Sequence, residues 1–272
     1  MRKIFKTYPG VETIEGAGVR LTRIFGFYDV EQLDPFLLLD FFNSKNPGDY
    51  LRGFPWHPHR GIETITYLIE GELKHGDSLG NQGTILPSGC QWMTAGRGIL
   101  HQEMPQESTH LLGCQLWLNL PRKDKMTEPA YRDIDKNDLA IYEDEHVLVK
   151  VICGEYRGAK GPVKGTYVEP TYFDVQLYPN QTFAWQIEES KQCFILKLDG
   201  VLEIGGQILE DRGALLTKGD EVRIFSQEGG RFLIITGEPL EEPVAWRGPI
   251  VMNTEEELNQ AYRELRKRTF IK

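Results

Sequence analysis

Short runs of alternating apolar and polar residues, most of them ending near a glycine or proline, cover most of the chain. The clearest runs are ETITYLIEG, TILPSG, HLLGCQLWLNL, VLVKVICG, YFDVQLYP, CFILKLDG and RFLIITG. A period of two with turn residues at the breaks predicts antiparallel strands that form sandwiches or barrels. The chain is therefore predicted to be all-β for most of its length.

One segment near the carboxyl end has helical periodicity instead. In NTEEELNQAYRELRKR, Thr254 is placed to cap a helix, and Glu257 three residues later completes a capping box. Acidic residues come first and basic residues last, as the helix dipole favours. The apolar positions at helical spacing are Leu258, Ala261, Tyr262 and Leu265, and they predict the face that packs on the body of the protein.

Comparison of the chain with itself indicates two similar halves. A shift of 129 residues places Trp56 on Trp185 and aligns EGEL with DGVL. The polar segment DKNDLAIYEDEH lies between the halves. We therefore predict two β domains, residues 1–134 and 135–272, with the helix in the second.

Charge and composition exclude several classes of protein. With 31 Lys and Arg against 40 Asp and Glu, the net charge of −9 argues against direct nucleic-acid binding through phosphates. Neither a secretory signal nor the ~20 apolar residues of a membrane span is recognisable. The four cysteines are widely spaced, without a CxxC pair, and are expected to be reduced thiols of a cytoplasmic protein.

Two pairs of candidate metal ligands stand at strand spacing. His57 and His59 form one pair, and His101 and Glu103 form the other. Alternate residues of a strand point to the same face, so each pair projects together, and two neighbouring pairs can converge on one ion. An isolated HxH pair usually consists of ordinary histidines, but the second pair favours a site for iron, manganese, nickel or copper.

Glu63 is an alternative carboxylate ligand. It shares parity with His57 and His59 and so could face the same interior, and spacing alone leaves the choice between Glu63 and Glu103 open. The remaining histidines have no partner at strand spacing and are not expected to bind metal. They are His75, His110 and His146.

The candidate ligands do not recur in the second half. The shift of 129 places His57 and His59 on Gln186 and Glu188, and a shift of 130 places His101 and Glu103 on Arg231 and Leu233. The chemistry is therefore expected in the first half. The chain also lacks a GxSxG nucleophile elbow and a GxxxxGK[ST] phosphate loop.

Two long motifs, HPHRGIETITYLIEG and QWMTAGRGILHQEMP, together with DPFLLLDFF and PIVMNTEEEL, resemble the pirin family of the cupin superfamily over nearly the whole chain. The resemblance implies a bicupin, in which two double-stranded β-helix barrels lie face to face and the first holds metal. It implies that the ligands are His57, His59, His101 and Glu103, with Glu103 preferred to Glu63. Fe(II) is the ion usual in such proteins, while Ni, Mn, Co, Cu and Zn also suit these donors.

The resemblance also implies two alternative functions. Several pirin-like proteins resemble quercetin 2,3-dioxygenases, which open the central ring of a flavonol with loss of carbon monoxide. We therefore expect a dioxygenase acting on a small aromatic substrate and O2, with Glu103 accepting the substrate's hydroxyl proton. The alternative is a non-catalytic regulator whose metal oxidation state alters its affinity for a protein partner. A purely structural metal is least expected, because such sites favour tetrahedral Cys and His ligation.

Aromatic and apolar residues near these motifs are candidates for a substrate pocket. They are Phe36, Phe41, Phe42, Trp56, Met93 and Trp117, with Trp56 ranked first because it adjoins His57. The polar candidates are Gln115 and Arg60.

Overall fold

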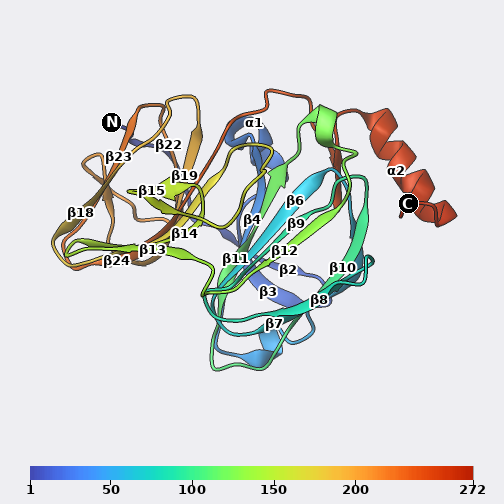
Figure 1. The fold of residues 1–272 in the computed structure, drawn as a ribbon, viewed down its shortest axis with the longest axis horizontal. Coiled ribbons are helices and arrows are strands. Elements are labelled where there is room, and N and C mark those ends of the chain that lie inside the picture. Colours follow the sequence, from blue (N-terminus) through green and yellow to red (C-terminus); the bar gives the residue numbers. More distant parts are fainter. Residues whose placement is uncertain (272) are drawn as a thin grey trace. The chain divides into compact units, whose positions relative to one another are not determined.

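The computed structural model describes residues 1–271, and the chain forms two compact units (Figure 1). The amino-terminal unit comprises Val11–Gln32, Phe36–Lys136 and Leu240–Lys272. The carboxy-terminal unit comprises Met1–Gly10, Leu33–Pro35 and Asn137–Pro239. Both consist mainly of antiparallel strands, so the all-β prediction is confirmed.

Two sheets build the amino-terminal unit. The larger sheet has the order β12 (Ala130–Ile134), β9 (Cys90–Thr94), β6 (Ile62–Glu70), β11 (Leu111–Asn119), β4 (Phe36–Ser44), β3 (Val19–Phe25) and β2 (Val11–Glu15). The smaller sheet has the order β5 (Phe54–His59), β10 (Ile99–Pro105), β7 (Leu73–Asp77) and β8 (Gln82–Ile85). Val19 and Leu68 from the larger sheet pack in one buried cluster with Leu73 from the smaller sheet, so the two sheets share a core.

The carboxy-terminal unit repeats this arrangement strand for strand. Its larger sheet has the order β1 (Ile4–Tyr8), β22 (Gly213–Leu216), β19 (Gln192–Gly200), β24 (Gly230–Gly237), β17 (Thr171–Leu177), β14 (Val147–Cys153) and β13 (Ala140–Glu143). Its smaller sheet has the order β18 (Gln181–Gln186), β23 (Glu221–Ser226), β20 (Glu203–Ile204) and β21 (Gln207–Ile208). Each strand of these four sheets thus has a counterpart in the other unit, and the two halves are similar in topology.

Short elements complete the chain. They are the hairpins β15 (Glu155–Tyr156) with β16 (Ala159–Lys160) and β25 (Ala245–Arg247) with β26 (Ile250–Met252), the 3-10 turns Phe27–Asp29, Pro47–Asp49 and Arg122–Asp124, and the helices α1 (Val30–Leu33) and α2 (Glu255–Lys267). Within residues 1–271, no helix has the length and apolar character needed to span a bilayer.

Helix α2 begins as the sequence predicts. The Thr254 hydroxyl accepts a hydrogen bond from the Glu257 backbone N–H at 3.2 Å, and the Glu257 carboxylate accepts one from the Thr254 N–H at 3.0 Å. Leu258 and Ala261 are buried on the predicted face. The capping box and the helix are therefore confirmed.

The two units differ from the predicted division at both ends of the chain. The sequence predicts that residues 1–10 belong to the first domain and α2 to the second. In the structure, residues 1–10 belong to the carboxy-terminal unit and α2 belongs to the amino-terminal unit. The reason is strand pairing and packing: β1 pairs with β22, and Ile250 of β26 bridges to Arg60 in the amino-terminal unit. The division between the halves falls after Lys136, near the predicted junction at residues 134 and 135.

Candidate metal centre

The two candidate pairs lie on neighbouring strands of the smaller sheet. β10 pairs with β5, and His101 stands directly opposite His57. Burial alternates along β10, whose buried positions are Ile99, His101, Glu103 and Pro105. Because alternate residues share a face, His101 and Glu103 both point into the unit, at positions where a β-barrel core usually has apolar side chains.

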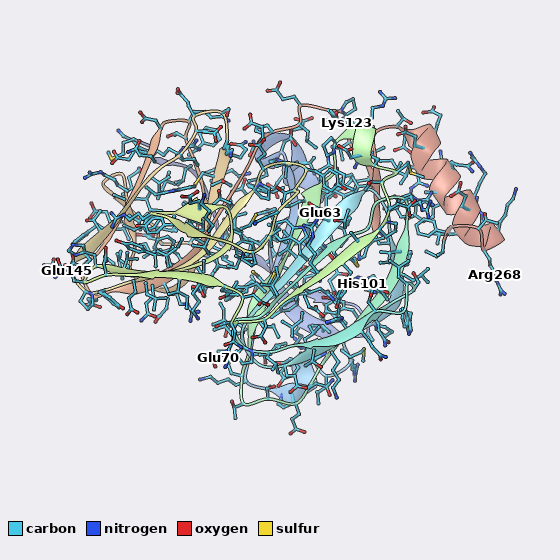
Figure 2. The ribbon with its side chains drawn as sticks, in the orientation of Figure 1. Glu63, Glu70, His101, Lys123, Glu145 and Arg268 are labelled. Carbon is cyan, nitrogen blue, oxygen red and sulfur yellow. The ribbon has the colours of Figure 1, made fainter. Side chains whose placement is uncertain are left out.

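Three imidazoles meet inside this unit. The ligand atoms of His57, His59 and His101 lie within 4.8 Å of one another, and Figure 2 labels His101 among the strands. Their ring centroids are 4.4 to 4.9 Å apart. Within residues 1–271, these histidines are the one group of three or more potential metal ligands.

Hydrogen bonds determine which ring nitrogens of His57 and His59 face each other. Nδ1 of His57 lies 2.9 Å from the carbonyl oxygen of Pro55, and Nδ1 of His59 lies 3.1 Å from that of Pro249. A carbonyl oxygen only accepts, so both Nδ1 atoms carry hydrogen, and in a neutral ring of this tautomer Nε2 presents a lone pair. These Nε2 atoms are 3.1 Å apart. Two facing lone pairs repel unless a cation lies beside them, so the pair is arranged for a metal ion.

The His101 side chain completes this group of donors. It is buried, and neither of its ring nitrogens has a hydrogen-bond partner. Burial, together with the smaller effect of the neighbouring imidazoles, lowers the pKa of His101 well below its ordinary value and that of His59 to about 3. Neutral imidazole is the form that binds metal, so the three rings fit an ion.

Glu103 is held beside the histidines but is not part of their group. Its Oε1 accepts a hydrogen bond from the Thr66 hydroxyl at 2.7 Å, and its Oε2 accepts one from the Gln115 amide at 2.6 Å. Nε1 of Trp117 donates to Oε1 of Gln115 at 3.1 Å, which orients that amide. Each carboxylate oxygen still has a second lone pair, so Glu103 is positioned and retains acceptor capacity.

Glu63, the alternative carboxylate, faces the other side of the larger sheet. Thr66 on β6 points to the interior, where its hydroxyl donates to Glu103. Glu63 lies three residues earlier on the same strand, so its side chain is on the opposite face and points away from Glu103. The Glu63 carboxylate accepts hydrogen bonds from Nε1 of Trp92 at 3.1 Å and from the Thr94 hydroxyl at 2.7 Å. Burial raises the pKa of Glu63, against the effect of these two donors.

The parity argument for Glu63 is therefore wrong. The chain turns between β5 and β6, where Gly61 has a φ of 78°. Parity is preserved only along a continuous strand, so it does not carry from His59 across this turn.

A cavity of about 580 Å³ opens beside His57 and His59. Its aromatic side chains are Phe27, Phe54, Trp117 and Trp246. Ring centroids are 4.9 Å apart for His59 and Trp117, 5.9 Å for Trp117 and Trp246, and 5.6 Å for Trp246 and Phe27. Aromatic walls with a few polar groups are typical of sites for flat organic ligands.

The polar side of the same cavity is formed by an ion pair. Arg23 donates two hydrogen bonds of 2.8 Å to the Asp40 carboxylate and a third of 2.8 Å to Glu15. All three residues line the cavity. They supply charged groups to the lining of the cavity.

The predicted pocket residues are only partly correct. Trp117 and Gln115 line the cavity, whereas Phe36, Phe41, Phe42 and Met93 are buried in the packing of the unit. Trp56 is 52% exposed, because it alternates with His57 along β5 and points outward. Arg60 turns toward α2. Phe27 and Trp246 were not predicted, since they lie far from the histidine motifs in the sequence.

Comparison with known proteins identifies the family. The Pirin model matches residues 18–118, and the Pirin C-terminal cupin domain model matches residues 172–271. A Pirin-like protein of Caulobacter vibrioides is 40% identical over 274 residues, which cover 99% of either protein. Human Pirin is 41% identical over 94% of this chain and 89% of its own length. The chain is a member of the pirin family.

A solved structure supports the same conclusion. The quercetin 2,3-dioxygenase from Acinetobacter baumannii is 33% identical and superposes with a TM-score of 0.90, covering 99% of this chain and 98% of that one. The resemblance to pirins and the two cupin domains are thereby confirmed.

The second cupin domain of this pirin-family chain has an apolar interior where the first has histidines. β18 and β23 take the places of β5 and β10 in the strand order. Across this pair Phe183 stands opposite Ile224, and Trp185 stands opposite Val222. All four pack in or against one hydrophobic cluster. The absence of ligands from these positions explains why the histidine group lies in the amino-terminal unit.

The sequence alignment of the two halves is wrong in detail. It places Trp56 on Trp185, yet Trp56 points outward while Trp185 packs on Phe173 with centroids 5.2 Å apart. It also places His101 on Arg231, which lies on β24, the counterpart of β11 and not of β10. The connecting loops differ in length between the units, so a nearly constant shift cannot align every strand.

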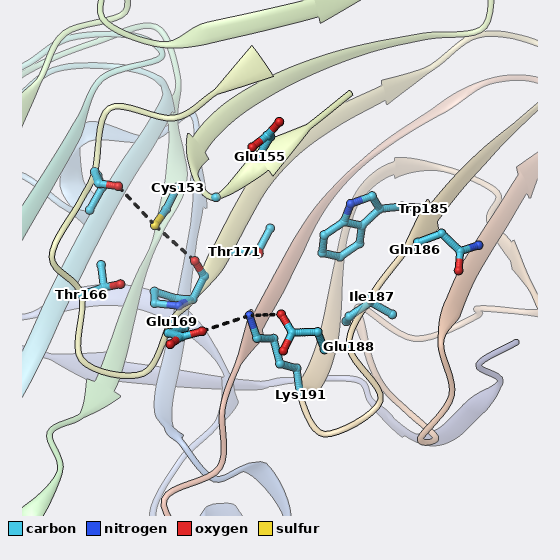
Figure 3. Close-up of a pocket in the computed structure, with 13 residues that line it drawn as sticks. Cys153, Glu155, Thr166, Glu169, Thr171, Trp185, Gln186, Ile187, Glu188 and Lys191 are labelled. Carbon is cyan, nitrogen blue, oxygen red and sulfur yellow. Dashed lines mark hydrogen bonds and ion pairs between the residues drawn. The ribbon is translucent and has the colours of Figure 1, made fainter. Parts of the chain in front are cut away.

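A cavity of about 410 Å³ in the carboxy-terminal unit contains different chemistry (Figure 3). Trp185 lines it, and the Lys191 ammonium lies 3.2 Å from the Glu188 carboxylate and 3.8 Å from that of Glu169. Gln186 and Glu188, aligned with the histidines by sequence, line this cavity. No histidine lines it, so this cavity lacks the imidazole donors of the first unit.

The other nucleophilic and titratable candidates are also accounted for. The cysteines Cys90, Cys114, Cys153 and Cys193 are buried thiols that form no disulfide. Burial raises the pKa of Cys193 to about 12, which disfavours the reactive thiolate. The histidines outside the group contact other residues: His75 contacts Tyr131, His110 contacts Asn43 and His146 contacts Gln181.

Proposed function

We propose that this protein is a metal-dependent dioxygenase that cleaves flavonols such as quercetin with O2. The observation that carries the proposal is the facing pair of Nε2 atoms on His57 and His59, beside the unpartnered ring of His101 and an aromatic cavity. The likeness to a structure named quercetin 2,3-dioxygenase adds support.

We assign the metal to His57, His59, His101 and Glu103. Three neutral imidazoles and one carboxylate would suit a divalent ion. Fe(II) is the ion that we propose, and Ni, Mn, Co, Cu and Zn accept the same donors. A bound ion would supply Lewis acidity and hold the two reactants together.

The protein's own residues would then prepare the substrate. Glu103 would accept the proton of the flavonol hydroxyl, since its oxygens retain free lone pairs. Thr66 and Gln115 would hold the carboxylate in place through their hydrogen bonds of 2.7 and 2.6 Å. Two fixed donors on one carboxylate reduce the reorganisation that the proton transfer requires.

The aromatic wall would orient the substrate. Trp117 and Trp246 both line the cavity with ring centroids 5.9 Å apart, and a flavonol is flat and aromatic. Packing of the flavonol against these rings would exclude water from the reacting hydroxyl. The Arg23 and Asp40 pair would offer hydrogen-bonding groups to the polar edge of the substrate.

The test is steady-state turnover of quercetin by protein loaded with Fe(II), with O2 consumption and carbon monoxide release both measured. The proposal expects both in the wild type and neither above background in His101→Ala. His146→Ala is the control, because His146 is partly exposed and outside the histidine group. Undiminished turnover in His101→Ala would overturn the proposed site.

A wild type that is fully loaded with metal but consumes no O2 would overturn the enzymatic proposal. The alternative would then be a binding module, in which ferrous and ferric protein differ in affinity for a protein partner. Pull-down with both oxidation states distinguishes that outcome from an inactive preparation, whose metal content would be low.

A further inference from the structure

The carboxyl-terminal segment of the chain reaches the metal centre. The carbonyl oxygen of Pro249 accepts the hydrogen bond of His59 Nδ1 at 3.1 Å, and Trp246 lines the adjoining cavity. Both residues lie in or between β25 and β26, immediately before α2. Pro249, 190 residues from His59 in sequence, therefore fixes the tautomer of that candidate ligand.

Arg60, the residue after His59, anchors the end of α2. Its side chain is 2% exposed, and its guanidinium lies 2.8 Å from the Glu264 carboxylate. It also donates to the carbonyl oxygen of Phe270 at 3.0 Å and lies over the Phe270 ring, 4.1 Å from the centroid. A buried guanidinium depends on such partners, because removing one leaves a charge uncompensated.

Backbone contacts join the same parts of the chain. The Val251 N–H donates to the Arg60 carbonyl at 3.1 Å. The buried ammonium of Lys125 donates to the carbonyl oxygens of Gly61 at 2.8 Å and Val251 at 3.0 Å. The turn after the HxH pair, the β25–β26 hairpin and α2 are therefore held as one cluster, which we call the Arg60 clamp: Arg60, Gly61, Lys125, Val251, Glu264 and Phe270.

We infer that docking of α2 through the Arg60 clamp and metal binding at the three histidines are thermodynamically coupled. Release of α2 would free the backbone next to His59 and displace Pro249, two residues from Val251, so the His59 ring would lose its fixed orientation. By linkage, a metal ion that requires this orientation stabilises the docked helix to the same extent. The clamp residues are thus positioning residues. The inference rests on metal binding alone and not on flavonol cleavage.

A second ion pair on α2 provides a matched control. Arg247 and Glu255 are 3.1 Å apart at the start of the helix, with side chains 52% and 62% exposed. An exposed pair contributes little free energy, and this pair does not contact Arg60. Loss of Glu255 should therefore leave the clamp and the histidines unaffected.

The first experiment is hydrogen exchange of the wild-type protein with and without Ni²⁺, a metal that does not oxidise during the measurement. Coupling predicts slower amide exchange in α2, at residues 255–267, when Ni²⁺ binds. A merely structural role for the helix predicts protection at the histidine strands and none in α2. Unchanged exchange in α2 at saturating Ni²⁺, or no Ni²⁺ binding at all, would overturn the inference.

The second experiment compares Ni²⁺ affinity by calorimetry in Glu264→Gln and Glu255→Gln. Removal of a direct hydrogen-bond partner of a ligand typically weakens metal binding by 10- to 100-fold, and Glu264 acts one contact further out, through Arg60, so we expect the low end, about tenfold, for Glu264→Gln. Glu255→Gln should bind as the wild type does. Wild-type affinity in a Glu264→Gln protein whose α2 exchanges faster would overturn the coupling.

Phe270→Leu provides a second variant if Glu264→Gln does not fold. It removes the ring beneath the guanidinium and keeps the backbone carbonyl that Arg60 binds. Ni²⁺ affinity is expected to fall in this variant too, by a smaller factor than in Glu264→Gln. These readouts use metal binding and exchange, so they separate failure of this inference from failure of the dioxygenase proposal, which is measured by O2 and carbon monoxide.

Discussion

The amide of Gln115 donates a hydrogen bond of 2.6 Å to the Glu103 carboxylate, and the two residues come from different sheets of the amino-terminal unit. Gln115 is itself oriented by Trp117, a residue of the cavity wall. The Gln115 amide thus links Trp117, which lines the cavity, to Glu103, the carboxylate that we propose accepts the substrate's proton. The orientation of Glu103 depends on this connection and on the Thr66 hydroxyl.

Replacement of Gln115 should therefore reduce turnover even when the metal site is filled. Gln115→Met keeps the approximate volume and removes the donor to Glu103, so we expect kcat for quercetin to fall about 10- to 100-fold in protein assayed at saturating metal. Thr66→Ser is the control, since it keeps a hydroxyl. A wild-type kcat in Gln115→Met would show that the amide does not position the carboxylate.

Acidification should destabilise the metal-free protein through its buried histidines. The pKa of His59 is about 3 in the folded protein because of burial, while an unfolded histidine titrates near 6.5. Between these values the unfolded state binds a proton that the folded state does not, so the free energy of unfolding falls as pH decreases from 6.5 toward 3. His59 alone accounts for about 2 kcal/mol at pH 5.

Urea unfolding of chelator-treated protein between pH 7 and 5 measures this loss. His59→Gln cannot take up the proton, so its stability should fall less over the same interval. The carboxylates titrate in both proteins, so their effect on stability cancels. The difference between the two slopes of unfolding free energy against pH is then the contribution of His59. Parallel pH profiles would contradict the assignment of the lowered pKa to this residue.

The aromatic wall should determine affinity for the substrate. Trp246→Ala removes a ring that lines the cavity, and we expect the quercetin Kd to rise about tenfold, for a loss of roughly 1.4 kcal/mol. Trp56→Ala removes an indole that adjoins His57 in sequence but is 52% exposed and outside the cavity. Fluorescence titration with quercetin in the absence of O2 measures the Kd of both variants. An equal rise in Kd for Trp246→Ala and Trp56→Ala would contradict the proposal that Trp246 contacts the substrate.

Much of this architecture was predictable because it depends on local periodicity. The alternation in ETITYLIEG corresponds to β6, and the capping box at Thr254 starts α2 where expected. The two HxH-type pairs come together because each lies within one strand, where a spacing of two guarantees a shared face. Local patterns therefore identified the three histidines.

The remaining features depend on contacts that the local pattern does not contain. Glu63 stayed an alternative ligand on spacing alone, because the sequence pattern does not show that the turn at Gly61 breaks the alternation between β5 and β6. The contribution of Trp246 and Pro249 to the site requires the carboxyl-terminal segment to return to the amino-terminal unit. Apolar residues next to a motif do not reveal which of them faces a cavity, as Trp56 and Trp117 illustrate.

Gly61 should be among the least replaceable residues of the amino-terminal unit. Its φ of 78° disfavours any side chain, and a Cβ atom there would collide with the carbonyl oxygen of Val251. Gly61→Ala should lower the free energy of unfolding by about 3 kcal/mol or more, because backbone strain adds to the displacement of β26.

Gly80→Ala separates the two causes, since Gly80 has a φ of 91° and a Cβ there would meet nothing within 4 Å. Strain alone should cost that variant about 1–2 kcal/mol. Urea denaturation of both measures the difference, and equal losses would show that β26 yields to the new methyl group without cost.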